Sequence, residues 1–335
     1  MPKPIALLVF LLLEIALLPI TIVGQVLFYI GFLLGVPGKK VNWTTYDPAF
    51  ARWILDGLGK RKDKATRQLT YAMPGCSRLT VGLAYAPTLW AMRVTDITIN
   101  MFEYPTHHSS GIVGAFSHRT RFFDDAMLSY LDRVEQVVIL GAGWDTRAYT
   151  LAQREGVRVF EVDVAGMQTQ KRKALEVARI DSSHVIFASA DFNEESWLDA
   201  VRRVNLDPSK ATFVLMEGLT YYLNPEALEA TLQTVATQLA KGSAVAFDYV
   251  GRHIIESVGP LFYRLLLPMS RLMGVSWVFG ISTDSPAEEK LAAFLDENGL
   301  ELAEYEPVGN ADRKQRLIGG LVLATNGQIG DQPSA

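Results

Sequence analysis

Four short segments bring glycine, acidic and aromatic residues together in this sequence. They are GAGWDTR (141–147), EVD (161–163), ADF (190–192) and EGLTYYL (217–223). Each follows or completes a short apolar run, so each marks the carboxyl end of a predicted β-strand. In an open parallel sheet these ends lie along one edge, and ligands bind there. The four segments therefore predict one binding site.

The first segment gives the backbone unusual freedom at Gly141 and Gly143. Glycines on either side of Ala142 let the chain turn sharply and approach a ligand closely. A GxGxxG dinucleotide motif needs glycine at position 146, where Thr146 stands. The spacing thus disfavours a pyrophosphate cradle and, with it, a nicotinamide oxidoreductase.

Acidic side chains end the next three strands. Asp163 lies about 20 residues after Gly141, the offset at which an acid reaches a ribose hydroxyl. Asp191 can accept from an adenine amino group while Phe192 packs on the ring, although a helix N-cap is the alternative role for Asp191. Glu217 is expected under the central crevice, or as a structural carboxylate. An adenosine-shaped site without a phosphate cradle suits S-adenosylmethionine (SAM) better than NAD or ATP.

Strands that alternate with helices indicate an α/β fold with a mostly parallel sheet. The continuously apolar runs fit a sheet covered on both faces. The last two runs have no helix between them, so we expect an antiparallel pair at one edge. The predicted strands are 136–141, 157–163, 184–191, 212–218, 243–250, 300–308 and 316–325, and the predicted helices between them are 167–178, 195–204, 225–239 and 286–298.

Several segments resemble the leucine carboxyl methyltransferase family of SAM-dependent O-methyltransferases. The resemblance rests on VVILGAGWDTRAYTL, FEVDVAGMQTQKRKAL, ASADF and MEGLTYYL, preceded by YDPAFARWIL and SHRTRFFDDAML. It covers roughly residues 46–325 and is most specific over residues 119–223. It implies a Rossmann-like SAM-methyltransferase fold and methyl transfer to an oxygen. Trp144 departs from the family, which more often has Leu or Met there, and the segment 61–102 is unfamiliar.

The resemblance also implies that eight residues contact SAM. The RTR triplet leaves the helical register open by one step, so Arg121 is the alternative to Arg119 for the methionine carboxylate. The eight are Arg119 for the methionine carboxylate, Gly141, Ala142 and Gly143 beside the methionine moiety, Asp163 for the ribose, Asp191 and Phe192 for the adenine, and Glu217 for the amino group.

Acceptor chemistry decides which further residues are needed. A carboxylate acceptor needs no base, only an arginine or tyrosine that holds its second oxygen. A hydroxyl or phenol needs a base to take its proton. We predict Tyr221 and Tyr222 as donors and His118 as the base, with His107, His108 and His253 as alternative bases.

The N-terminal head is the most apolar part of the chain. Residues 5–36 contain one ionisable side chain, Glu14, and are long enough to cross a hydrocarbon core of ~30 Å. A helix kinked at Pro19, a re-entrant hairpin around Pro19 and Gly24, a signal peptide and a buried core helix are the alternatives. Eight Lys and Arg residues between positions 39 and 67 favour a cytoplasmic body. We predict a membrane protein whose catalytic domain is cytoplasmic.

Composition limits the remaining possibilities. The mean hydropathy is +0.14, whereas the net charge of −4 and the pI of about 5.8 give no support for nucleic-acid binding. A single cysteine, Cys76, excludes a disulfide scaffold and a cysteine-built metal site, and no metal site is predicted. The predicted parts are a membrane-inserted segment (1–40), a helical cap or linker (41–115), a methyltransferase domain (116–328) with an apolar lid near 252–282, and a disordered tail (329–335).

The predicted function is SAM-dependent methyl transfer to an oxygen of an apolar or membrane-associated acceptor. That acceptor is a small or lipid-like molecule, and membrane lipid is the expected partner. The alternative is a membrane-anchored, non-catalytic interaction protein that keeps the SAM fold. The sequence leaves the oligomeric state open.

Overall fold

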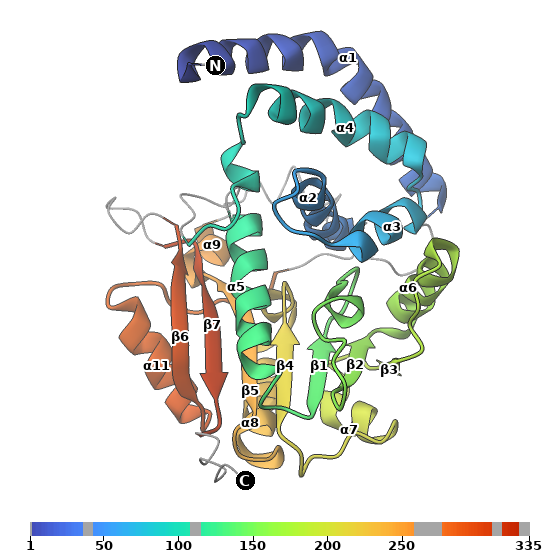
Figure 1. The fold of residues 1–335 in the computed structure, drawn as a ribbon. Coiled ribbons are helices and arrows are strands. Elements are labelled where there is room, and N and C mark those ends of the chain that lie inside the picture. Colours follow the sequence, from blue (N-terminus) through green and yellow to red (C-terminus); the bar gives the residue numbers. More distant parts are fainter. Residues whose placement is uncertain (1, 36–42, 108–114, 258–276, 310–316, 328–335) are drawn as a thin grey trace.

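A seven-stranded sheet runs through the centre of the molecule (Figure 1). The computed structural model describes residues 2–35, 43–107, 115–257, 277–309 and 317–327. The strands are β1 (Gln136–Leu140), β2 (Arg158–Asp163), β3 (Val185–Ser189), β4 (Thr212–Met216), β5 (Ala244–Val250), β6 (Glu301–Val308) and β7 (Gly319–Thr325).

The strand order is β3-β2-β1-β4-β5-β7-β6, and it reverses direction along the sheet between β1 and β4. Strands β1 to β5 pair in parallel, whereas β7 is antiparallel to both β5 and β6. The predicted α/β architecture is therefore confirmed: the sheet is mostly parallel, and an antiparallel pair forms one edge. Each predicted strand coincides with an observed one to within a few residues.

The sheet is buried on both faces because its central strands are apolar at most positions. Val137 and Ile139 of β1 face one hydrophobic core, whereas Val138 and Leu140 face the other. Alternate side chains of a strand point to opposite faces, so a strand covered on both sides needs a continuous apolar run. The first core includes α5 (Ala115–Tyr130) and α6 (Ala165–Ala178), and the second includes α7 (Trp197–Arg202), α8 (Pro225–Gln238) and α11 (Ala287–Glu297).

Three helices lie over the carboxyl ends of the parallel strands (Figure 1): α2 (Tyr46–Gly57), α3 (Lys64–Ala72) and α4 (Arg78–Thr95). Their starts are set by local capping. The Asp63 carboxylate accepts from the Thr66 N–H at the start of α3. Ser77 and Thr80 form a reciprocal capping box at the start of α4. These helices occupy the region predicted as a cap.

The apolar head forms one continuous helix, α1 (Lys3–Gly35), which passes through Pro19 without interruption. The alternative of a hairpin around Pro19 and Gly24 is therefore wrong. Helix α1 curves across the top of α4 in Figure 1. Among the described helices it alone has the length and composition to cross a membrane, and 11% of its most apolar window is buried.

Close backbone contact holds α1 against α4. A Cβ built on Gly24 would lie 2.7 Å from the Cα of Ala84, and one on Gly31 would lie 2.7 Å from the carbonyl oxygen of Gly75. Only glycine permits these approaches. Near the other end of α1, the Thr88 hydroxyl donates to the Glu14 carboxylate at 3.1 Å. The one acidic side chain of the head is thus directed at α4.

Some sequence predictions fall on residues outside the described ranges. Most of the predicted lid does so, because only α9 (Arg252–Ser257) and the stretch from residue 277 onward are described there. His108 and the predicted disordered tail also lie outside the described residues. These predictions stay predictions.

The α1–α4 contact generates a stability prediction with a matched control. Gly24→Ala forces a Cβ into the backbone of α4, so we expect a loss of about 1–3 kcal/mol in the free energy of unfolding. Gly82→Ala, in the middle of α4, adds a methyl group where nothing lies within 4 Å and should stabilise by about 0.5–1 kcal/mol. Thermal unfolding in detergent measures both, and equal shifts of the two variants would contradict the close packing.

Candidate active site

A sharp turn follows β1 and is bonded to the end of β2. Gly141 and Gly143 have φ values of +64° and +39°, in the left-handed region that favours glycine. The Gly141 N–H donates to the Val162 carbonyl at 2.8 Å, and the Gly143 N–H donates to Asp163 Oδ2 at 2.8 Å. The structure therefore brings the glycine turn and Asp163 together, as the strand-end argument predicts.

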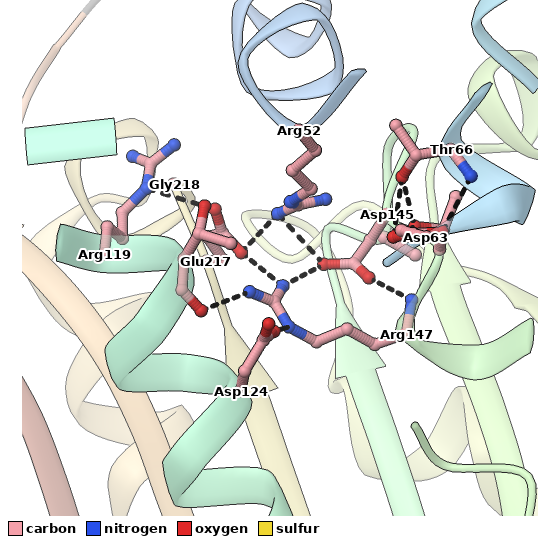
Figure 2. Close-up of polar contacts among 12 residues, drawn as sticks. Arg52, Asp63, Thr66, Arg119, Asp124, Asp145, Arg147, Glu217 and Gly218 are labelled. Atoms are coloured by element: carbon pink, nitrogen blue, oxygen red, sulfur yellow. Dashed lines mark hydrogen bonds and ion pairs between the residues drawn. The ribbon is translucent and has the colours of Figure 1, made fainter. Parts of the chain in front are cut away.

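A fully buried arginine lies beside this turn (Figure 2). Arg147 Nη1 donates to Asp145 Oδ2 and to Glu217 Oε2, each at 2.5 Å, and Arg147 Nε donates to Asp124 Oδ1 at 2.6 Å. These four residues come from the loop after β1, from the end of β4 and from α5. One guanidinium thus connects the centre of the sheet to the helix that packs on it.

Two more arginines converge on Glu217 from different helices (Figure 2). Arg52 of α2 contacts Glu217 at 2.6 Å and Asp145 at 3.4 Å. Arg119 of α5 donates to Glu217 Oε1 at 3.1 Å. Burial alone would raise the pKa of the Glu217 carboxyl, but Arg52, Arg147 and Arg119 together hold it well below its ordinary value. Glu217 is therefore ionised, and it ties the cap to the sheet.

The ion pairs continue from the sheet into α3. Arg61 pairs with both Asp63 and Asp124, and the Asp124 contact is 2.6 Å long. The Thr146 hydroxyl donates to Asp63 Oδ2 at 2.7 Å. Only a three-residue 3₁₀ turn, η4 (Arg147–Tyr149), follows the glycine turn. A pyrophosphate site at a helix N-terminus does not fit this arrangement, because no α-helix starts at this turn and the buried Thr146 hydroxyl is bonded to the Asp63 carboxylate.

Asp248, near the end of β5, is a site residue that the sequence argument missed. Its Oδ2 accepts from Arg119 Nη1 at 3.1 Å, and its Oδ1 accepts from the Gly218 N–H at 2.6 Å. Burial raises the pKa of this carboxyl, and the Arg119 charge opposes the shift. The signal was an acid inside the apolar run 243–250, just before its carboxyl end.

Aromatic rings line the turn after Glu217. The ring centroids of Tyr221 and Tyr222, in η5 (Thr220–Tyr222), are 4.7 Å apart, and Trp277 lies 5.3 Å from Tyr221. The Tyr222 hydroxyl donates to Thr44 Oγ1 at 3.0 Å. Burial raises the pKa of both phenols, so each stays protonated at neutral pH. Trp277 is a second residue that the sequence argument did not single out.

A column of aromatic rings connects α1 to the glycine turn. Trp144, within that turn, packs edge-on against Tyr46 with centroids 5.9 Å apart. Tyr46 in turn contacts Phe32 of α1 at 5.3 Å and Phe28 at 6.1 Å. Trp144, which departs from the family pattern, is thus connected through Tyr46 to the apolar head.

A lysine holds the glycine turn from beneath. The buried Lys171 ammonium of α6 donates to the Ala142 carbonyl at 3.2 Å and lies 2.7 Å from Glu161 Oε2. Burial raises the pKa of the Glu161 carboxyl to about 7, although the Lys171 charge opposes that shift. The orientation of the Ala142 peptide therefore depends on Lys171 and, through it, on the buried Glu161 carboxyl, whose pKa is about 7.

Other predicted residues lie apart from this cluster. Asp191 is exposed, and its Oδ1 accepts from the Asn193 N–H at 3.1 Å, whereas Phe192 is half-buried against the second core. His118 is buried with its Nε2 2.5 Å from Glu306 Oε2 on β6. Arg121 also pairs with Glu306. The structure therefore brings Arg119, and not Arg121 or His118, to Glu217, and the roles of these residues stay predictions.

The residues missed by the sequence argument were present in its motifs. Asp145 and Arg147 belong to GAGWDTR, and Arg52 belongs to YDPAFARWIL. A charged residue inside an otherwise buried segment was the available signal. Their partners lie far away in the sequence, so the charged residues alone did not indicate which side chains pair with one another.

Comparison with known proteins finds similarity over the region that contains the four strand-end segments. A family model described as leucine carboxyl methyltransferase matches residues 81–236. A Streptomyces avermitilis protein named "putative S-adenosyl-L-methionine-dependent methyltransferase" is 37% identical over 142 residues, which cover 42% of this chain and 50% of that protein. A Mycolicibacterium gilvum protein with the same description is 34% identical over 165 residues, covering 47% and 53%. The chain thus spans about half the length of the curated relatives it matches.

Among solved structures, one described as "a putative methyltransferase" from Thermobifida fusca YX is similar to this chain. It is 16% identical, the match covers 80% of this chain and 96% of that one, and the TM-score is 0.48.

The arginine network generates a stability prediction. Arg147→Met leaves Asp124, Asp145 and Glu217 without their shared partner, so we expect a loss of about 3–5 kcal/mol in the free energy of unfolding. Arg203→Met removes an exposed pair with Glu195 and should cost at most about 1 kcal/mol. Denaturant unfolding compares the two, and a similar small cost for both would show that the buried network is not essential.

The Lys171 pair generates a pH prediction. The folded protein binds the Glu161 proton more tightly than the unfolded chain does, because burial raises the pKa of this carboxyl from its ordinary value of 4.5 to about 7. Stability from this group is therefore complete below the unfolded pKa and is lost as the pH rises through about 7. We expect a fall of about 1–3 kcal/mol from pH 5 to 8, which Glu161→Gln flattens. Unfolding curves across this pH range test it, and parallel profiles for the two proteins would contradict it.

Proposed function

We propose that this chain is a SAM-dependent methyltransferase that methylates an oxygen of an apolar, membrane-associated acceptor. One observation carries the proposal: Asp163 is hydrogen-bonded to the Gly143 N–H of the glycine turn, at the carboxyl ends of adjacent strands. The turn also lies at the point where the strand order reverses, and such points bind ligands in α/β sheets. The match of residues 81–236 to the leucine carboxyl methyltransferase model supports SAM as the cofactor.

The residues of the site fit the charge of SAM. The cluster contains six carboxylates (Asp63, Asp124, Asp145, Asp163, Glu217 and Asp248) and four guanidiniums (Arg52, Arg61, Arg119 and Arg147). The excess of negative charge favours a ligand that carries a sulfonium and an ammonium group with one carboxylate. A dinucleotide diphosphate would meet the same carboxylates with repulsion, which disfavours the oxidoreductase alternative.

Specific residues are then assigned to parts of the cofactor. Asp163 retains lone pairs that can accept from ribose hydroxyls, and Arg119 offers a guanidinium for the methionine carboxylate. Glu217 is ionised and can accept from the amino group. Gly143 permits the sharp turn, because its φ of +39° lies in the left-handed region that favours glycine. Asp191 and Phe192 are proposed for the adenine end.

SAM supplies an electrophilic methyl group, so the protein needs mainly to orient the acceptor and exclude water. Tyr221 and Tyr222 are protonated and can donate hydrogen bonds. A donor of this kind can hold one oxygen of a carboxylate while the other reacts, and a carboxylate needs no base. These properties favour a carboxylate acceptor over a hydroxyl, which would require a base such as His118.

The apolar head supports a membrane location with the methyltransferase body on the cytoplasmic side. The outer face of α1 is exposed and apolar along the helix. An acceptor that partitions into lipid would be concentrated beside the cap. The alternative, a membrane-anchored interaction protein without activity, is favoured by one observation: Arg119 is already paired with Glu217 and Asp248.

Calorimetry with SAM separates these two functions. We expect SAM binding with a micromolar Kd and at least a tenfold weakening in Asp163→Ala, because the ribose loses its acceptor. Asp199→Ala, which removes an exposed carboxylate on α7, is the matched control and should bind normally. A folded wild-type protein that binds no SAM would favour the interaction protein.

Acceptor profiling tests the reaction itself. Membranes that contain the protein are incubated with methyl-tritiated SAM, and lipid and protein fractions are then extracted separately. We expect label in the lipid fraction that mild alkali releases as volatile methanol, because a methyl ester hydrolyses and a methyl ether does not. Asp163→Ala membranes provide the background. Alkali-stable label would contradict carboxylate methylation, and label in water-soluble products alone would contradict the membrane acceptor.

A further inference from the structure

Helix α1 has one buried stripe along its whole length. Ala6 and Phe10 are buried near its start, and Gly24, Phe28 and Phe32 are buried toward its end. The spacing of four residues within each group places them on one face of the helix. A helix of 33 residues is about 50 Å long, so the stripe extends well beyond a single local contact.

Two polar side chains of α1, Glu14 and Gln25, are turned toward α4. The Glu14 carboxylate accepts from Thr88 of α4, and the Thr21 hydroxyl donates to the Leu17 carbonyl within the helix. Gln25 bonds to the Tyr85 hydroxyl. Polar groups that face a partner helix, together with glycines at the contact, are typical of helices packed in lipid.

This packing prevents α1 from crossing a bilayer while the fold stays intact. From Glu14 to Gly35 the helix is fastened to α4 and to the turn at Gly75. Helix α4 is itself fastened to α2, because the Arg93 guanidinium donates to the Gly57 carbonyl. The segment of α1 before Glu14 is about 11 residues, or about 16 Å, long. A hydrocarbon core is ~30 Å thick, so that segment reaches about half way.

The outer surface of the α1–α4 pair is apolar over both helices. Helix α4 contributes Leu79, Trp90 and Val94 to it. Exposed cationic side chains lie at the start of each of the two helices, Lys3 on α1 and Arg78 on α4. The α1 members are Ile5, Leu7, Leu8, Leu11, Leu12, Ile15, Leu18, Ile20, Ile22, Val23, Val26, Leu27, Tyr29, Ile30, Leu33 and Leu34.

We propose that α1 and α4 together form a monotopic docking surface that lies in one leaflet of an anionic bilayer. The apolar face enters the leaflet, and Lys3 and Arg78 contact lipid phosphates. Both ends of α1 then lie on the same side of the membrane as the body. This inference deepens the membrane location proposed above and does not depend on methyl transfer.

A lipid leaflet fits this surface better than a second copy of the chain does. Protein interfaces have an apolar centre with a polar rim. Here the apolar face continues along about 50 Å of helix, and Glu14 and Gln25 bond inward to α4. Trp90 and Tyr29, which are both exposed, suit the boundary between headgroups and acyl chains.

Sidedness of labelling tests the topology in the full-length chain. In a Cys76→Ser background, Pro2→Cys reports the start of α1, and Val177→Cys reports the body, where Val177 is 73% exposed. An impermeant maleimide is applied to bacterial spheroplasts and to inverted membrane vesicles. We expect both cysteines to react only in inverted vesicles. Reaction of Pro2→Cys in spheroplasts, with Val177→Cys unreactive, would falsify the monotopic arrangement and establish a span.

Vesicle flotation tests the contribution of α4 to binding. Trp90→Glu should weaken association with phosphatidylcholine vesicles that contain phosphatidylglycerol at least tenfold, and Val177→Glu, at an exposed apolar residue of α6, should not. Unchanged binding of Trp90→Glu would show that α4 does not contact lipid.

The remaining outcomes separate this inference from the proposals above. A wild-type protein that stays with the soluble fraction and elutes as a dimer would overturn it in favour of a second copy. SAM calorimetry on the same preparations is read independently, so loss of methyl transfer and loss of docking are distinguishable.

Discussion

The buried guanidinium of Arg147 is the interaction on which the rest of the site depends. It has no exposed surface, and it meets carboxylates from the loop after β1, from the end of β4 and from α5. Removing charges from water is costly unless each has partners of good geometry, and here each carboxylate has at least one guanidinium within 3 Å. The network fixes the strand ends and the helix relative to one another before any ligand arrives. Arg52 then adds α2 to the same unit through Glu217.

This network has a second property that bears on ligand binding. Arg119 is already paired with Glu217 and Asp248. A ligand carboxylate would therefore compete with these two carboxylates for its guanidinium. Exchange of one carboxylate for another keeps the total charge of the pair balanced and avoids exposing an unpaired buried ion. A ligand that also carries cationic groups can compensate the carboxylate it displaces. Preorganisation of this kind favours a zwitterionic ligand over a simple anion.

Much of the fold could be predicted from the sequence, because β-branched runs and helical segments alternate with clear boundaries. The strand ends at Gly141 and Asp163 were equally readable, since their chemistry is local. The arginine pairs were not, because partners such as Arg52 and Glu217 lie 165 positions apart and only tertiary packing unites them. The orientation of α1 was also beyond the sequence: it depends on which glycine meets which backbone, as at Gly24 and Ala84. A hydropathy pattern reports length and apolarity but not direction.

The aromatic column from Phe32 through Tyr46 to Trp144 has a practical consequence. One face of the apolar head is part of the hydrophobic core. Removal of residues 1–35 would expose Tyr46 and Phe50 to water, because they pack against Phe28 and Phe32 of α1. Replacing the outward-facing leucines of α1 with polar residues would change its apolar surface and leave the inner stripe and its support of the glycine turn in place.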